Sequence, residues 1–137
     1  MDKFWNEYQE ELKDGYFRLV DDRKSLKPKF IVEYPEELAK KLTSNSCNKL
    51  SQIWKFYDHV LQIQDNIKKG VSLEFYKAEL CRLLPAVNYA MERKTVTRDF
   101  KQFIDYNVQY IDDGEDLEAF AKHFQSLIAY LPRQNQK

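Results

Sequence analysis

The sequence predicts an all-α protein, folded as a compact bundle of about five to six helices. Only three of the 137 residues are glycine and four are proline, which leaves little material for turns. Leu, Lys, Glu and Gln are common, and all of them favour helix. Aromatic residues form 15% of the chain and bury large apolar areas, so a core can form. We therefore expect a single helical domain over residues 1–137.

The N-terminal part predicts one helix and then a loop. Apolar side chains within residues 4–12 recur with helical spacing, and Gly15 interrupts or ends this helix before residues 16–19 continue the apolar pattern. Pro28 and Pro35 both favour extended backbone in the residue that precedes them. These prolines predict a loop at about residues 25–35 that crosses the surface.

Two helices are expected next. Pro35 suits the first turn of a short helix ending near Leu42, because a missing amide costs nothing there. Residues 43–46 are Thr, Ser, Asn and Ser, all good N-cap residues, and a long apolar run with helical spacing follows them. Gly70 is well suited to end that long helix.

The next predicted helix, over residues 72–93, carries Pro85 in its middle. Proline lacks an amide donor and its ring crowds the carbonyl four residues back, which bends or breaks a helix at a cost of about 3 kcal/mol. Two further helices are expected at about residues 97–111 and 115–131. A short polar tail then begins at about residue 133.

Charge is unevenly distributed along the chain. The 22 basic and 22 acidic residues cancel, which argues against a protein that holds nucleic acid by bulk attraction alone. Residues 1–39 contain seven basic and ten acidic residues, net −3, whereas residues 40–101 contain twelve and six, net +6. Residues 102–137 contain three and six, again net −3. The basic middle either faces a polyanion or forms an ordinary solvated helix surface.

The residue types that carry catalysis are few and scattered. His59 and His123 are far from each other and from any cysteine in the sequence, and we expect both at the surface or its boundary. Cys47 and Cys81 lie in apolar helical patterns without metal-ligand or redox spacing, so we expect them to be reduced, buried and inert. A turn and an acidic helix start explain the acidic cluster at residues 112–118. We predict no enzyme, cofactor, metal site or small-molecule substrate.

The N-terminus has no apolar core of the signal-peptide type. No window approaches the roughly 18 apolar residues that are needed to cross a bilayer. We expect a cytoplasmic protein that has no membrane partner.

Two groups of polar side chains are candidates for contacting an anion. One group follows helical spacing along the long helix, on the side away from its apolar face, with Lys49 beside it. It consists of Asn48, Gln52, Lys55, His59 and Gln62. Such a stripe suits a row of phosphates, and an ordinary solvated helix face is the alternative.

The second group lies where one helix ends and the next begins, and it consists of Arg93, Lys94, Arg98 and Lys101. Cations at a helix start oppose the helix dipole and need compensation. A bound phosphate held by free backbone amides supplies it, and a carboxylate such as Asp99 supplies it equally well.

Three segments follow patterns that recur in a known family. Residues 51–57 follow a pattern of Gln, an aliphatic residue, Arg and a hydrophobic-aromatic pair, with Trp54 in place of the arginine. Residues 85–93 keep the proline, tyrosine and arginine of a second pattern, while Ala86 replaces a lysine and Glu92 a glycine. The third pattern is an aromatic-rich final helix that ends in an aliphatic-Ala-Tyr sequence, and residues 120–130 match it.

In order and spacing, these segments resemble the small subunit of type III-A CRISPR (Csm) effector complexes, over about residues 35–131. The resemblance implies a non-catalytic, RNA-binding helical scaffold that packs as a short filament within a ribonucleoprotein. It implies guide RNA and target RNA, the backbone and large subunits, and further copies of the chain as partners. RNA contact of this kind is to phosphate and ribose and independent of sequence. We select six residues for it: Lys49, Gln52, Lys55, Arg93, Lys94 and Arg98.

Two alternatives stay open. The small subunit of type III-B complexes is a close competitor. A helical protein-interaction adaptor that does not involve RNA is the other alternative, and it predicts an exposed apolar face without clustered cations. Residues 1–34 have no predicted role.

Overall fold

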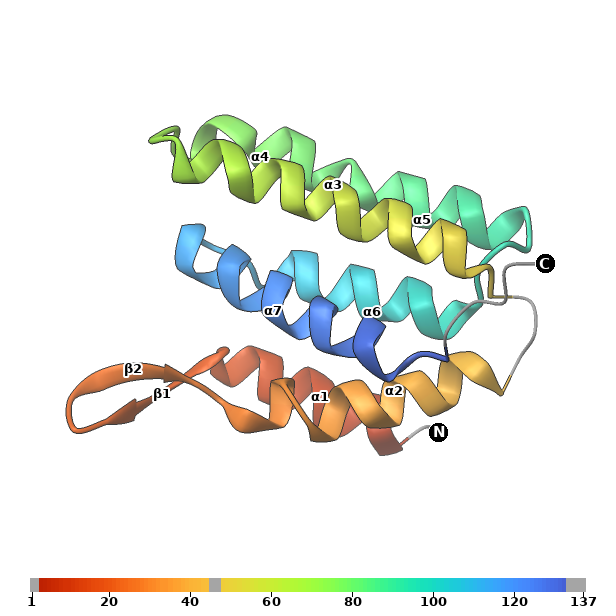
Figure 1. The fold of residues 1–137 in the computed structure, drawn as a ribbon, viewed down its shortest axis with the longest axis horizontal. Helices are drawn as coiled ribbons and strands as arrows, with labels where there is room; N and C mark the ends of the chain where they lie inside the picture. Colours follow the sequence, from red (N-terminus) through yellow and green to blue (C-terminus); the bar gives the residue numbers. More distant parts are fainter. Residues whose placement is uncertain (1–2, 45–47, 133–137) are drawn as a thin grey trace.

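A computed structural model describes residues 3–44 and 48–132, which form seven α-helices, one β-hairpin and a short 3-10 turn. Three layers are visible in Figure 1. The first layer holds α1 (Lys3–Asp14), β1 (Phe17–Val20), β2 (Arg23–Leu26) and α2 (Glu33–Thr43). The middle layer holds α6 (Arg98–Gln109) and α7 (Gly114–Tyr130). The third layer holds α3 (Leu50–Lys68), α4 (Leu73–Cys81) and α5 (Leu83–Glu92). The predicted all-α class is confirmed, with a two-stranded hairpin added. No helix in the described ranges is long and apolar enough to cross a membrane.

The hairpin replaces the helical pattern that residues 16–19 suggested. Gly15 ends α1 with a φ of 106°, and β1 then pairs antiparallel with β2. Asp21 and Asp22 connect the strands with φ values of 53° and 64°, which is the geometry of a type I′ turn. A four-residue apolar segment fits helix and strand periodicity about equally, so spacing alone misassigned it.

The segment expected as a surface loop at residues 25–35 is more ordered than predicted. It contains the end of β2, a 3-10 turn η1 (Pro28–Phe30) and the first turn of α2, in which Pro35 lies as expected. Phe30 is completely buried, and its ring centroid lies 5.1 Å from that of His123. The segment therefore runs along the surface, as predicted, and is anchored to the core by the buried ring of Phe30.

The proline-containing helix is divided at Arg82 into α4 and α5, which is why there are seven helices rather than six. Pro85 is the third residue of α5, so its missing amide falls in a first turn, where a helix tolerates it. Arg82 keeps φ −64° and ψ −18°, and α5 continues nearly in line with α4 (Figure 1). Cys81, expected to be buried, is exposed just before this break.

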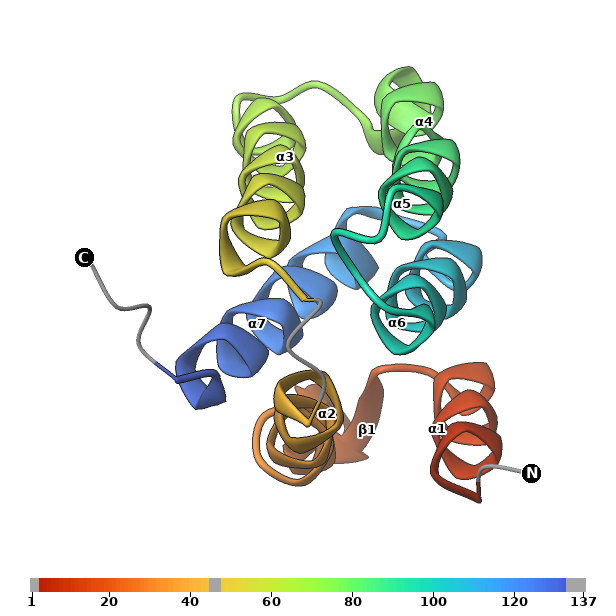
Figure 2. The same ribbon diagram turned by 90° about the vertical axis from the view of Figure 1, so that its right-hand side faces the viewer.

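The middle layer carries most of the core. In Figure 2, α7 runs obliquely between α2 and α3, while α6 lies between α1 and α5, and these helices are in contact. Four completely buried phenylalanines form a continuous chain of ring contacts along α6 and α7: Phe100, Phe103, Phe120 and Phe124. The middle layer thus holds the two outer layers together.

A buried hydrogen-bonded chain crosses this core. The Tyr16 hydroxyl donates to Asn107 Oδ1 at 2.7 Å, and Asn107 Nδ2 donates to the Tyr8 hydroxyl oxygen at 2.6 Å. Tyr8 contacts His123 Nε2 at 2.7 Å, and His123 Nδ1 lies 2.6 Å from the Phe30 carbonyl oxygen. Since a carbonyl only accepts, Nδ1 carries the proton and Nε2 accepts from Tyr8, which makes the imidazole neutral.

His123 is therefore not a surface or boundary residue, as its sequence context led us to expect. It is completely buried, because it shares the apolar face of α7 with Phe120 and Phe124. Burial lowers the pKa of His123 to about 4. His59 is half-buried, as expected of a boundary residue.

The helix starts differ in detail from the sequence predictions. α3 begins at Leu50, and Thr43 ends α2 rather than capping α3. Gly70 follows the end of α3 with a φ of 96°, as predicted. Asp113 caps α7 by accepting a hydrogen bond from the Asp116 amide at 2.9 Å, which accounts for part of the acidic cluster. The N-cap of α3 is Lys49, so the cap expected at residues 43–46 was wrong. Cys47 and the polar tail from residue 133 lie outside the described residues.

Candidate nucleic-acid interface

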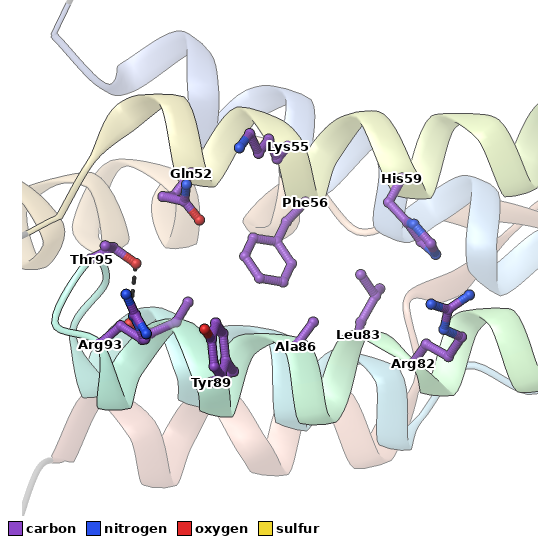
Figure 3. A pocket seen from close by; sticks show the side chains of 11 residues that line it. Gln52, Lys55, Phe56, His59, Arg82, Leu83, Ala86, Tyr89, Arg93 and Thr95 are labelled. Carbon is purple, nitrogen blue, oxygen red and sulfur yellow. Dashed lines mark hydrogen bonds between the residues drawn. The ribbon is translucent and has the colours of Figure 1, made fainter.

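An open pocket of about 500 Å³ lies between α3 and α5, shown in Figure 3. α3 contributes one face of side chains and α5 the opposite face, each with helical spacings of three and four. The lining residues are Gln52, Lys55, Phe56 and His59 from α3, and Arg82, Leu83, Ala86, Tyr89, Ala90, Arg93 and Thr95 from α5 and its flanks. We call this site the α3–α5 pocket.

The floor of the α3–α5 pocket is apolar and rigid. Phe56 points between the two helices in Figure 3 and is 8% exposed. Its ring lies edge-on to that of buried Phe100, with centroids 5.5 Å apart, so the core holds it in place. Leu83 and Ala90 are also buried. Ligand contact with this floor removes apolar surface from water without rearranging the helices.

Cations border this floor. Lys55, Arg82 and Arg93 all line the pocket, and no carboxylate does so within the described part of the chain. Glu79 lies just outside it, 3.3 Å from Arg82 Nη1 and 3.8 Å from His59 Nε2. The Arg82 end is thus partly neutralised, whereas the end near Arg93 is not.

Lys55 and Arg93 have no ion-pair partner among residues 3–44 and 48–132. The Arg93 guanidinium instead lies over the ring of Tyr89, 5.4 Å from its centroid. This cation–π contact holds the guanidinium beside the pocket while its charge stays available.

The turn after α5 places a third cation at this end. The Thr95 amide donates to the Ala90 carbonyl and the Lys94 amide to the Met91 carbonyl, the two bonds of a Schellman motif. Lys94 occupies its left-handed position with a φ of 64°, where glycine is usual and a side chain costs about 1 kcal/mol. An exposed lysine is thus held in a strained backbone position.

Two hydrogen-bonded links bring the remaining predicted cations to the same end. The Lys49 amide donates to the Thr95 carbonyl at 2.8 Å, joining the start of α3 to the turn after α5. Asn48 Oδ1 accepts from the Thr97 amide at 2.8 Å, next to Arg98, the first residue of α6. The starts of α3 and α6 therefore meet the end of α5.

The six predicted RNA-contacting residues fall into two sets. Gln52, Lys55 and Arg93 line the α3–α5 pocket. The other three are exposed on the joined segments at its end: Lys49, Lys94 and Arg98. None of the five cations among these six has a carboxylate partner within the described ranges.

Other members of the predicted polar groups serve the fold. Asn48 links two helix starts, as described above, and Lys101 pairs with Asp105. Asp99, the carboxylate proposed as an alternative partner for Arg98, instead accepts a hydrogen bond from Trp5 Nε1 at 2.8 Å. The side chain of Asp99 is thus used to attach α1 to α6.

Sequence reasoning missed Arg82, Tyr89 and Phe56 as pocket residues. Counting back from Arg93 by four, three and four gives Tyr89, Ala86 and Arg82, so helical spacing alone identifies that face. The identity of the helix that faces it follows only from the tertiary structure.

Comparison with known families gives one match. The family described as Csm2 Type III-A matches residues 25–136, a range that contains the α3–α5 pocket and leaves α1 and β1 outside it. No curated protein and no solved structure matches the chain. The family match confirms the resemblance found in the sequence. This chain belongs to the Csm2 family and is a small subunit of type III-A CRISPR complexes.

Proposed function

We propose that this subunit is a non-catalytic scaffold that contacts the backbone of guide and target RNA through the cations around the α3–α5 pocket. The observation that carries the proposal is the set of unpaired cations. Lys55 and Arg93 lie along the pocket, and Lys49, Lys94 and Arg98 lie at its end without a carboxylate partner in the described ranges. Charges left unpaired on adjoining segments favour an anionic partner outside the chain.

Contact with the backbone suits a subunit that serves any guide. Phosphates and riboses are the same at every position, so lysine and arginine bind them without reading the sequence. Gln52 adds a neutral hydrogen-bonding group between the charged ones. The zero net charge of the chain is compatible with this role, because the acidic surfaces outside the pocket are left to meet basic protein surfaces.

Self-association in a filament and contact with the backbone and large subunits belong to the same proposal. Large apolar side chains are exposed on several elements: Phe75 on α4 at 75%, Leu19 on β1 at 71% and Trp54 on α3 at 48%. Exposed aromatic and aliphatic side chains of this size are typical of subunit interfaces. We expect the assembled particle in the cytoplasm.

Co-purification tests the scaffold role. The tagged chain is recovered from its native host, with and without nuclease treatment, and bound proteins and small RNAs are identified. Repeat-derived guide RNA together with backbone subunits is the expected result. Recovery of other proteins without RNA would support the adaptor alternative and leave the cations as a solvated surface.

The charged residues are tested by the double change Arg93→Ala and Lys94→Ala. Target RNA binding by the purified ribonucleoprotein should weaken, and the slope of log K against log salt should fall by about 1.4 to 1.8, the range for two phosphate contacts on single-stranded or duplex nucleic acid. The control changes Lys13 and Lys122 to alanine, because each pairs with a glutamate on its own helix, α1 or α7. Affinity and slope unchanged by the first pair would remove both residues from the interface.

A further inference from the structure

We infer that the α3–α5 pocket receives an unpaired RNA base, which stacks on Tyr89 over the Phe56 floor while Lys55 and Arg93 hold its phosphates. This inference rests on the proposed function and specifies its ligand, since it assigns single-stranded RNA rather than duplex to the site. Three features of the pocket have no use in phosphate binding alone.

The first feature is the apolar floor. A duplex presents phosphates, 2′-hydroxyls and base edges to a protein and keeps the flat faces of its bases stacked inside. Cations alone suffice for such a partner. The α3–α5 pocket also has Phe56, Leu83 and Ala86 between its cations, and these match the flat face of an unstacked base.

The second feature is the exposure of Tyr89. Its side chain is 63% exposed although its neighbours Val87 and Ala90 are buried, and its hydroxyl has no hydrogen-bond partner in the described ranges. The Arg93 guanidinium covers the ring on one side. Ala86 lies on the other side in Figure 3 and, with only a methyl group, leaves room beside the ring. Tyr89 is therefore a stacking surface with one side held and the other open.

The third feature is the size and polarity of the pocket. Its volume of about 500 Å³ falls in the roughly 300–1,000 Å³ range of sites that hold small organic groups. The Gln52 side-chain amide, which has no partner among the described residues, offers a donor and an acceptor to a base edge. Lys55 and Arg93 border the same space, so a phosphate attached to that base lies within their reach.

The test compares single-stranded and duplex RNA. The full-length chain is titrated at low ionic strength against a fluorescein-labelled oligouridine of about 12 nucleotides and a blunt duplex of equal length, with anisotropy as the readout. Tyr89→Ala should weaken oligouridine binding about 5- to 150-fold, the loss expected for one stacked base, and leave duplex binding unchanged. Tyr89→Phe keeps the ring and should stay within about twofold of the parent chain.

Two further measurements test base stacking in the same pocket, one with a second variant and one with a modified RNA. Ala86→Leu fills the space beside Tyr89 at an exposed helical position, and should weaken oligouridine binding without changing the thermal stability of the chain. An oligomer with abasic sites should bind the parent chain as weakly as oligouridine binds the Tyr89→Ala variant.

Each outcome bears on the inference. Equal binding of oligouridine by the parent chain and Tyr89→Ala, or undiminished binding of the abasic oligomer, overturns base stacking and leaves backbone contact intact. Absence of all RNA binding by the parent chain contradicts the proposed RNA contact itself. An acidic, aromatic peptide that competes with oligouridine for the parent chain, and binds Tyr89→Ala and Ala86→Leu more weakly, would assign the pocket to a protein partner.

Discussion

Two layers of the molecule carry many charged residues and use them differently. The first layer is formed by α1, the hairpin and α2, and the third layer by α3, α4 and α5. In the first layer, buried Lys27 is bonded to Glu11 at 2.7 Å and to Asp14 at 2.9 Å, which attaches the hairpin to α1. In the third layer, Lys55 and Arg93 line an open pocket without a carboxylate partner in the described ranges.

The aromatic residues differ in the same way. Tyr8 and Tyr16 are completely buried, and both hydroxyls belong to the hydrogen-bonded chain that ends at the Phe30 carbonyl. Tyr89 is exposed, and its hydroxyl has no partner in the described part of the chain. Residue type therefore does not separate side chains that serve the fold from side chains that stay available at the surface. What distinguishes them is whether the polar atoms and charges are satisfied within the chain.

The largest expected contrast is between two aromatic truncations. Phe103→Ala should lower the free energy of unfolding by about 3–5 kcal/mol, because the ring is completely buried against Phe100, Phe120 and Phe124. Tyr89→Ala, on the pocket, should change it by no more than about 0.5 kcal/mol. Urea denaturation measures both. A loss above about 2 kcal/mol for Tyr89→Ala would assign Tyr89 to the fold and remove the contrast.

The second contrast is the pH dependence of the buried histidine. The pKa of His123 in the folded chain is about 4, below its ordinary value of 6.5, so the folded state resists protonation. The stability from neutral His123 is therefore complete above pH 6.5 and is lost as the pH falls towards 4, by about 3 kcal/mol in total. Unfolding free energies at pH 7 and pH 5 should differ by about 2 kcal/mol from this cause, in a range where few carboxylates titrate.

His123→Gln is the matched control for the pH experiment. It should be less stable than the parent chain at pH 7, because Gln fits the site between Tyr8 and the Phe30 carbonyl less well. Its stability should change little between pH 7 and pH 5, since Gln does not titrate. An equal loss in both proteins would mean that another group carries the pH dependence.

The smallest expected effect is at Lys94. Lys94→Gly removes a side chain from a left-handed backbone position and should raise the free energy of unfolding by about 0.5–1 kcal/mol. Lys94→Ala keeps the unfavourable φ and should bring no such gain. Both changes remove the same charge and should weaken RNA binding equally. Greater stability with weaker RNA binding in Lys94→Gly would show that this position favours binding over the fold.

Much of the helical architecture was predictable from spacing and end signals. Gly70 ends α3, and Pro35 lies in the first turn of α2, because these residues act through their own backbone and need no tertiary information. The hairpin was missed because its turn uses Asp21 and Asp22 at positive φ, where the usual signal is Asn-Gly or Asp-Gly.

The remaining differences depend on which elements meet in space. Burial of His123 follows from its contacts with Tyr8 and Phe30, which lie 115 and 93 residues away in sequence. Half of the predicted RNA-contacting set lines the α3–α5 pocket: Gln52, Lys55 and Arg93. Gln52 and Lys55 lie on one face of α3 and Arg93 lies at the end of α5, and residue spacing alone identifies each of these two faces. Tyr89 and Arg82 became candidates only when α5 was seen to face α3.

The most direct test of the account is a cross-linking map of the native particle. The ribonucleoprotein is isolated through a tag on this chain and irradiated, and peptides that carry RNA are identified by mass spectrometry. The proposed interface predicts RNA on peptides from residues 48–59 and 82–98, which contain the cations and aromatic side chains of the α3–α5 pocket and its end. RNA confined to peptides from α1, the hairpin or α2, with none on those two segments, would contradict it.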